Sequence, residues 1–320
     1  MMTLSLCPTC YKTIPAEISL AEENSIVMLK ECSEHGEFFS VVESDALFYE
    51  KVMINNKRKN IYGGHFIDVT ERCNMKCNPC FFPVSTKEDR PIENILQEAA
   101  ICGSDIVILT GGEPLIRNDI DTLCESLVKS KHVEIVSNCK LFSTDMADAF
   151  KRIGVSLSLS YHPNDLDAFW SAIDTARKSG FHFASILFAV KDIHQIKGFI
   201  EISEQVRDVC TFFRLKAQVD IWNHKTSGNH IFTSDLLHEM IKFGASIAWF
   251  VDNKVSYTIV TLNNLGYALV SWYNIDNVDL LDIDVPPTYM ARTGHIKNFV
   301  TSLLINEGMQ KGWLNGARIA

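Results

Sequence analysis

Three cysteines in one short segment carry the strongest chemical signal of the sequence. Cys73, Cys77 and Cys80 have the spacing C-x3-C-x2-C and follow residues 65–70 (HFIDVT), an expected strand. Three thiolates on one loop can ligate three irons of a [4Fe–4S] cluster, and the fourth iron then stays free to bind an amine and a carboxylate. The alternatives are a zinc knuckle or a ferredoxin-type cluster, for which Cys102 is the only nearby fourth cysteine. Spacing and placement favour the open cluster.

A second motif lies one strand–helix unit further on. The strand expected at residues 105–110 (DIVILT) runs into Gly111-Gly112-Glu113-Pro114. Glycines let a backbone approach a ligand, and a carboxylate can pair with an ammonium. Together with the cysteine triplet, this motif resembles the signature of the radical S-adenosylmethionine (radical SAM) superfamily. The resemblance covers about residues 65–220, and it implies that Gly111, Gly112, Glu113 and Pro114 hold the methionyl amine of SAM.

The resemblance extends less strictly to two later strands. Ser137 and Asn138 end the third strand, where the family often has Ser/Thr-Asn-Gly near the SAM ribose; here Cys139 replaces the glycine. Ser158 and Ser160 share one face of the fourth strand because side chains alternate along a strand. The family often uses a serine here for SAM, and the alternative is a serine satisfied inside the barrel.

Two cations, Arg214 and Lys216, share a face of the expected sixth strand. Unpaired charges inside a barrel are costly, so both are expected to meet carboxylates of the ligand or the protein. Arg214 is a candidate for the SAM carboxylate or an anionic substrate. Candidates for the substrate pocket at strand ends are Asp68, Glu71, Tyr161, His162 and Lys216.

A separate group of metal-binding residue types lies near the N-terminus. Cys7-x2-Cys10 is followed after twenty-one residues by Cys32-x2-His35, which is close to zinc-site spacing. Rubredoxin-like iron and unligated thiols are the alternatives. Zinc would stabilise a module too small to fold unaided. Similar knuckles occur in the radical SAM branch that resembles tetraether lipid synthases and pterin-modifying methylases.

The elements that position these residues are strands alternating with helices, which predicts an α/β fold with a parallel sheet. We expect strands at 65–70, 105–110, 133–137, 156–160, 183–190 and 212–218, and helices at 92–102, 117–130, 143–153, 164–179, 192–208 and 234–244. Ser143, Asn164 and Asp192 are expected N-caps, and Gly154 and Gly180 expected C-terminal ends of helices. Six units indicate a partial (β/α)6 barrel of the TIM type, because a closed eight-unit barrel takes about 250 residues.

Four regions are expected. They are a small metal-knuckle module at residues 1–50, a linker at 51–64, the barrel at 65–248 and an α+β cap at 249–320. In the cap, residues 255–262 and 267–273 read as a β-hairpin, Pro286-Pro287 as a break and 293–311 as a helix that completes a lid.

Composition excludes several classes of protein. The chain has 320 residues, 47% of them hydrophobic, and a net charge of −9, which indicates a globular protein and argues mildly against broad nucleic-acid binding. No apolar run approaches the roughly 20 residues of a membrane span, and the N-terminus does not read as a signal peptide. Ten cysteines in this context favour metal sites in a reducing compartment, so the cytoplasm is expected.

The resemblance implies an enzyme that reductively cleaves SAM at a [4Fe–4S] cluster to a 5′-deoxyadenosyl radical. That radical takes hydrogen from an unactivated carbon, which leads to rearrangement or carbon–carbon bond formation, with flavodoxin or ferredoxin as electron donor. The substrate stays open: a nucleobase or nucleotide, including one in nucleic acid with the N-terminal knuckle as docking module, a lipid, a pterin or a peptide. A non-catalytic iron–sulfur or zinc scaffold is the alternative of another class.

Overall fold

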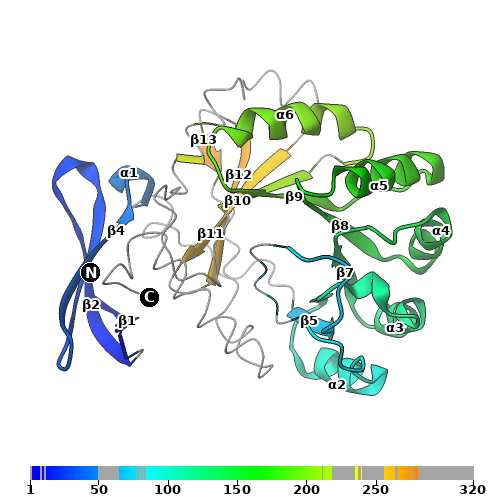
Figure 1. Cartoon of the computed structure of the whole chain (residues 1–320), viewed down its shortest axis with the longest axis horizontal. Helices are drawn as coiled ribbons and strands as arrows, with labels where there is room; N and C mark the ends of the chain where they lie inside the picture. Colours follow the sequence, from blue (N-terminus) through cyan, green and yellow to red (C-terminus); the bar gives the residue numbers. More distant parts are fainter. Residues whose placement is uncertain are drawn as a thin grey trace.

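The structure, a computed structural model, contains two β-sheets of different kinds. It describes residues 2–7, 9–10, 12–49, 65–77, 80, 82, 84–210, 212–217, 235–236, 239, 256–263, 266–274 and 277–279. The first sheet is antiparallel with the order β1-β2-β3-β4, and the second has the order β13-β12-β11-β10-β9-β8-β7-β6-β5. Figure 1 shows the first sheet in blue and the second from cyan to orange.

The N-terminal sheet consists of β1 (Met2–Leu6), β2 (Thr13–Leu20), β3 (Ile26–Cys32) and β4 (Gly36–Glu43), followed by helix α1 (Ala46–Tyr49). The 3-10 turn η1 (Glu22–Asn24) joins β2 to β3. The turn from β1 to β2 carries Cys7 and Cys10, and the turn from β3 to β4 carries Cys32 and His35. Two hairpin turns therefore place the predicted ligands at the same end of one sheet.

The second sheet begins with six parallel strands, as predicted. They are β5 (His65–Thr70), β6 (Ile106–Gly111), β7 (His132–Ser137), β8 (Ser156–Tyr161), β9 (Ser185–Val190) and β10 (Phe212–Ala217). The helices between them are α2 (Ile92–Ile101), α3 (Ile120–Leu127), α4 (Thr144–Ile153), α5 (Leu166–Ser179) and α6 (Gln195–Val206). In Figure 1 these helices form an arc outside the strands, the arrangement of a partial barrel.

Side-chain alternation separates a helix-facing core from an inner face. Leu157 and Leu159 of β8 are fully buried in the hydrophobic core, as are Ile67 and Val69 of β5. Ser158 and Ser160 alternate with the two leucines and therefore point to the other face of the sheet. Polar residues of the strands thus line the inside of the partial barrel, where a ligand can meet them.

The predicted hairpin is present, and it extends the sheet. β11 (Ser256–Asn263) and β12 (Gly266–Asn274) pair antiparallel, and β13 (Asn277–Asp279) pairs with β12. β11 also pairs parallel with β10, so the hairpin continues the barrel sheet along its edge. The predicted helix at 293–311, the break at 286–287, the linker at 51–64 and most of the helix at 234–244 lie outside the described residues.

Helix ends follow the predicted chemistry with two shifts. Ser143 accepts a hydrogen bond from the backbone N–H of Met146, and Gly154 and Gly180 end α4 and α5 in the left-handed conformation. The prediction of Asn164 as a cap was wrong by one residue, because Asp165 accepts from Ala168 N. The prediction of Asp192 was also wrong: α6 is capped at His194, and Asp192 accepts the His194 N–H in the preceding turn.

Candidate active site and metal centre

The two motifs meet at the carboxyl ends of the first strands. β5 and β6 pair parallel, with Asp68 opposite Thr110 and Thr70 opposite Gly111. The cysteine loop, from Cys73 to Cys80, leaves the end of β5, and Gly111-Gly112-Glu113-Pro114 leaves the end of β6. Ligands of open α/β sheets bind at this edge, beyond the carboxyl ends of the strands.

The two glycines are required by the close approach of the backbone that leads into the cysteine loop. A Cβ atom at Gly111 would lie 2.2 Å from the carbonyl oxygen of Thr70, and one at Gly112 would lie 2.1 Å from that of Arg72. Gly112 N donates to Thr70 O at 2.9 Å and Glu113 N to Arg72 O at 2.8 Å. Gly111 and Gly112 therefore let the end of β6 bond to the backbone that leads into Cys73.

Glu113 is buried and has only neutral partners among the described residues. Its carboxylate accepts from Leu115 N at 3.0 Å, Ser137 Oγ at 2.7 Å and Asn138 N at 2.8 Å. Burial raises the pKa of Glu113, although these hydrogen bonds act to lower it. A buried carboxylate without a cation suits a bound ammonium such as that of SAM. Pro114 begins the 3-10 turn η3 (Pro114–Ile116) that Glu113 caps.

The predicted third-strand motif lies against the same carboxylate. Ser137 and Asn138 are buried and hold Glu113 as described, so the turn after β7 is fixed to the turn after β6. Cys139 adopts the left-handed conformation, with φ of 57°, that glycine usually takes. The turn forms without the glycine because Cys139 N donates to Ser137 Oγ at 2.8 Å.

Two thiols of the cysteine loop, those of Cys73 and Cys77, lie where a cation is needed to keep them ionised. Burial raises the pKa of Cys73, and burial together with Cys80 and Cys73 raises that of Cys77 to about 11. Iron reverses this effect, because a coordinating thiol is deprotonated outright. The donor set of three thiolates on one loop fits three irons of a cluster.

Two arginines whose partners could not be predicted from the sequence fix the backbone at the start of the cysteine loop. Arg72 donates to Asp89 with Nε at 3.0 Å and Nη2 at 2.5 Å, and Thr70 Oγ1 donates to the same carboxylate. Arg117 is buried and donates to Val69 O at 2.7 Å. Charged residues near the motif were visible in the sequence, but their pairing across 17 and 48 positions was not.

Two substrate-pocket candidates have structural partners instead. Glu71 accepts from Ser85 Oγ at 2.6 Å and pairs with Lys87, which ties both ends of the loop segment together. Tyr161 is buried among the rings of Phe169, Phe188 and Phe199 and belongs to the core. Neither contact supports a role in binding substrate.

The inner face of the barrel carries a polar network that spans four strands. Ser158 Oγ donates to Glu134 Oε1 at 2.6 Å and lies 2.7 Å from Ser185 Oγ, so the alternative of a satisfied interior serine describes it. Arg214 Nη2 donates to Glu134 Oε1 at 2.9 Å, which confirms the expectation that it meets a carboxylate. Glu134 itself was missed, because an acidic residue in a strand carries no distinctive spacing.

The remaining candidates lie around this network. Ser160 and Asp68 are half-buried on the inner face. His162 follows β8, and its Nδ1 lies 3.7 Å from Cys77 Sγ, so it faces the cysteine loop. Burial lowers the pKa of His162. Lys216 is a residue of β10, and its side chain lies outside the described part of the chain.

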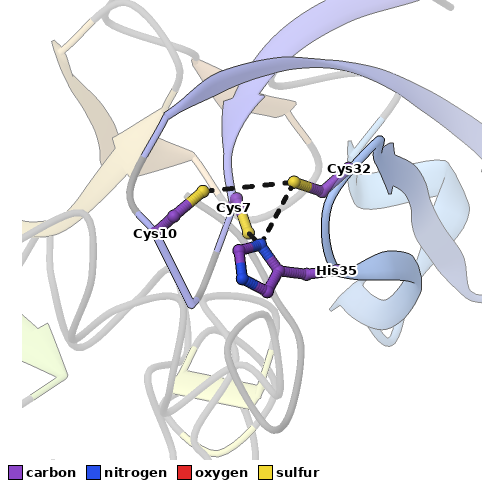
Figure 2. Close-up of side chains that lie close together, drawn as sticks. All are labelled: Cys7, Cys10, Cys32 and His35. Atoms are coloured by element: carbon purple, nitrogen blue, oxygen red, sulfur yellow. Dashed lines mark hydrogen bonds between the residues drawn. The ribbon is translucent and has the colours of Figure 1, made fainter.

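Four predicted ligands converge in the N-terminal sheet (Figure 2). Cys7, Cys10, Cys32 and His35 each offer a ligand atom, and these atoms all lie within 4.8 Å of one another. Cys10 Sγ lies 4.0 Å from Cys32 Sγ, and His35 Nδ1 lies 3.4 Å from Cys32 Sγ. Burial acts to raise the pKa of Cys7, but backbone hydrogen bonds at Cys10 and Thr9 outweigh it and lower the pKa to about 6. Three sulfurs and one imidazole suit tetrahedral zinc.

Comparison with known proteins agrees with both sites. Residues 67–196 match the radical SAM superfamily, and residues 1–44 match the N-terminal zinc ribbon domain described as HMPTM. The chain therefore joins a zinc ribbon to a radical SAM domain. Radical SAM domains use a [4Fe–4S] cluster and SAM, and both groups fit the residues described above.

Two curated relatives match part of the chain. The chain is 33% identical over 192 residues to 7,8-dihydro-6-hydroxymethylpterin dimethyltransferase of Methanocaldococcus jannaschii. This alignment covers 48% of this chain and 37% of that protein. The chain is 27% identical over 220 residues to GTP 3′,8-cyclase of Desulforamulus reducens. That alignment covers 60% of this chain and 67% of that protein. The match thus spans little more than a third of the first relative.

Solved structures show the same fold at low identity. SuiB of Streptococcus suis bound to the precursor peptide SuiA has a TM-score of 0.50 and 13% identity, covering 80% of this chain and 72% of that chain. Native anSMEcpe with bound AdoMet and the Cp18Cys peptide has a TM-score of 0.50 and 15% identity, covering 73% and 81%. In the described part of the chain, no helix is long and apolar enough to cross a membrane.

Proposed function

We propose that the protein is a radical SAM enzyme that removes a hydrogen atom from an unactivated carbon of a small heterocyclic substrate. The observation that carries this proposal is the contact between the two motifs. The backbone that leads into the cysteine loop, at Thr70 and Arg72, accepts hydrogen bonds from Gly112 N and Glu113 N. This contact lies beside the Glu113 carboxylate, which is buried and has no cationic partner among the described residues.

The residues have distinct tasks in this proposal. Cys73, Cys77 and Cys80 hold the cluster, and Glu113 receives the ammonium of SAM. A bound cluster would supply one electron to SAM, which would split into methionine and a 5′-deoxyadenosyl radical able to take a hydrogen atom from the substrate. Ser137 and Asn138 orient Glu113, and the buried strand ends exclude water from the site.

The substrate class rests on the two relatives. The pterin and the GTP in their names share a fused 2-amino-4-oxopyrimidine ring, which carries N–H donors and a carbonyl acceptor on one edge. The inner face of this barrel carries groups of the matching kinds, namely the carboxylates of Asp68 and Glu134 and the guanidinium of Arg214. Glu134 and Arg214 are bonded to each other, so a ring would bind at the edge of this pair. A pterin or purine ring is therefore favoured over a lipid or a peptide.

The same site must receive an electron from outside. Radical SAM enzymes in general need an electron donor, and we propose a flavodoxin or a ferredoxin. Rearrangement or carbon–carbon bond formation is the proposed outcome for the substrate radical. A non-catalytic scaffold is disfavoured, because a scaffold does not need a buried carboxylate suited to an ammonium.

The test is anaerobic reconstitution with iron and sulfide, reduction in the presence of SAM, and chromatography for 5′-deoxyadenosine. Wild type is compared with Cys77→Ala and with the control Cys102→Ala. Cys102 is half-buried at the end of α2 and donates to the backbone oxygen of Ala99, so it is a cysteine away from the loop. Wild type and the control should form 5′-deoxyadenosine, and Cys77→Ala should not.

Substrate class is tested in the same assay. A pterin, GTP, a peptide and a lipid extract are added separately, and stimulation of SAM cleavage by a pterin or purine is expected. If wild type holds a full cluster but neither binds nor cleaves SAM, the enzyme proposal is wrong and the scaffold replaces it.

A further inference from the structure

A short chain of hydrogen bonds joins the turn after β7 to the cysteine loop. Lys140 N donates to Asn138 Oδ1 at 2.9 Å, and Asn138 Nδ2 donates to Asn74 Oδ1 at 2.9 Å. A backbone N–H can only donate, so Asn138 must turn its oxygen to Lys140 and its nitrogen to Asn74. Asn74 must then present its oxygen to Asn138. The orientation of both amides follows from one backbone donor and not from a choice between similar atoms.

In this orientation the side-chain nitrogen of Asn74 is a donor without an acceptor. Asn74 Nδ2 is shielded from solvent and has no hydrogen-bond partner, and it is the one such side-chain atom in the part of the chain that the structure describes. Turning the amide over would not satisfy it, because the nitrogens of Asn74 and Asn138, which are both donors, would then face each other. Because buried polar groups in folded proteins are almost always paired, an acceptor is expected from a bound group.

The position of Asn74 limits what that group is. Asn74 directly follows Cys73, and its partner Asn138 donates through its backbone N–H to the Glu113 carboxylate at 2.8 Å. It thus lies between the proposed cluster ligands and the proposed ammonium site. SAM carries a carboxylate and ribose hydroxyls, and an amide N–H bonds most strongly to a charged oxygen.

We propose that Asn74 is a SAM-binding residue whose Nδ2 donates a hydrogen bond to an oxygen of SAM. The carboxylate of SAM is the favoured acceptor, because its oxygens carry charge. This assignment rests on the proposed function. Asn74 also has a structural contact, so a test must separate holding Asn138 from binding SAM. The two roles use different atoms of the same amide, Oδ1 and Nδ2.

Asn74→Asp makes that separation. Aspartate keeps an oxygen for Asn138 and replaces only the unpaired N–H by an acceptor. The substitution also lowers the net charge of the loop by one unit. Lys76→Gln, which lowers it by the same amount, is the matched control, because Lys76 is exposed in the same loop. Reconstituted proteins are assayed for iron content, for SAM affinity by equilibrium dialysis, and for the change that SAM causes in the EPR spectrum of the reduced cluster.

We expect Asn74→Asp to retain its iron while its Kd for SAM rises about tenfold or more above that of Lys76→Gln, a factor that corresponds to 1.4 kcal/mol. The SAM-dependent EPR change should require correspondingly more SAM. Equal affinity in the two variants would overturn the assignment. If Asn74→Asp does not hold iron, Asn74→Ser is measured instead, and wild-type affinity there would also overturn it.

The proposed function is judged separately, on wild type. If wild type holds the cluster and does not bind SAM, the enzyme proposal fails. If wild type binds SAM and the Asn74 variants bind it equally well, only the role of Asn74 fails.

Discussion

The zinc ribbon and the cysteine loop both gather cysteines, but the two sites differ in completeness. In the ribbon, four ligand atoms converge from two hairpin turns, and the pKa of Cys7 is lowered while that of Cys10 is raised. In the loop, three cysteines come from one segment, burial raises the pKa of Cys73 and Cys77, and Asn74 has an unpaired donor. The four ribbon ligands are enough to coordinate one metal ion. The cysteine loop has three cysteines and an unpaired Asn74 donor, so its site needs a further bound group.

This difference separates a structural site from a reactive one. A closed tetrahedral site contributes its binding energy to folding, because the ligands exist as a set only in the folded ribbon. An open site keeps unsatisfied groups buried, which costs stability unless a ligand supplies the missing partners. Losing the ribbon metal should therefore unfold a module, and losing the loop metal should remove activity from a barrel that stays folded.

The largest expected effect is the loss of Cys32, whose sulfur lies near both Cys10 and His35. Structural zinc contributes about 10–16 kcal/mol of binding energy in zinc-finger peptides. In Cys32→Ala, zinc should fall from one per chain to near none and the amides of β1 to β4 should lose protection from hydrogen exchange. Elemental analysis and exchange mass spectrometry measure both.

Cys77→Ala is the reciprocal variant for this comparison. It should lose iron and keep zinc, with hydrogen exchange in the ribbon unchanged. Loss of both metals in either variant would contradict the division into a closed and an open site.

The next effect concerns the contact between the two motifs. Alanine at Gly112 would set its Cβ 2.1 Å from Arg72 O, so the backbone must move. Overpacking of this kind costs about 1–3 kcal/mol, and Gly112→Ala should also lower the iron content. In the control, Gly198→Ala, nothing lies within 4 Å and the residue is inside α6. That variant should gain about 0.4–1 kcal/mol. Urea unfolding measures the change in the free energy of unfolding for both variants. A change of the same sign in both would refute the explanation by close backbone contact at Gly112.

The contrast between the two sites was visible in the sequence only in part. Metal-ligating residue types and glycines can be recognised by type and spacing, so the convergence of Cys7, Cys10, Cys32 and His35 could be predicted. The role of Cys73, Cys77 and Cys80 as cluster ligands stays a prediction. The six parallel strands could be predicted as well, because apolar segments alternate with helices at a regular length. The continuation of the sheet through β11 could not, since a hairpin carries no signal of its outer neighbour.

The supporting charges were harder to predict for a physical reason. Glu134 and Arg214 pair across 80 positions, and only the curvature of the sheet brings them together. Ser158 shows the reverse case. Its type and face suggested a ligand contact, but its hydroxyl bonds to Glu134 and Ser185. Alternation along the sequence predicts which residues share a face of a strand. The register of the neighbouring strands determines which side chains those residues contact.

A smaller effect is expected from the ion pair that anchors the cysteine loop. Asp89 receives two hydrogen bonds from Arg72 and one from Thr70. Burial acts against it, but these partners lower the pKa of Asp89. Asp89→Asn should cost about 2 kcal/mol, whereas Asp148→Asn, in an exposed pair with Lys151, should change stability by about 0.5 kcal/mol or less.

The pH dependence of this cost has a defined sign. Because the folded pKa of Asp89 lies below its unfolded value of 3.8, the stabilisation is present above about pH 4 and is lost as the pH falls through the folded pKa. Urea unfolding of wild type and Asp89→Asn should therefore differ at pH 7 and converge in acid. A difference that does not depend on pH would assign the effect to shape and not to charge.

The smallest effect sharpens the comparison at the open site itself. His162 Nδ1 lies 3.7 Å from Cys77 Sγ, and burial lowers the pKa of the ring, so the imidazole is neutral and has one N–H to give. Hydrogen bonds to cluster sulfurs raise the reduction potential, because they stabilise the added negative charge.

His162→Phe should shift the reduction equilibrium about tenfold towards the oxidised cluster, or 59 mV for one electron. His162→Asn places an amide N–H near the position of Nδ1 and should restore most of the shift, as measured by EPR-monitored redox titration. If phenylalanine and asparagine give the same potential, His162 only fills space beside Cys77. In the closed ribbon site the histidine is expected to bind the metal directly, whereas here a histidine is expected to act on the metal through the sulfur.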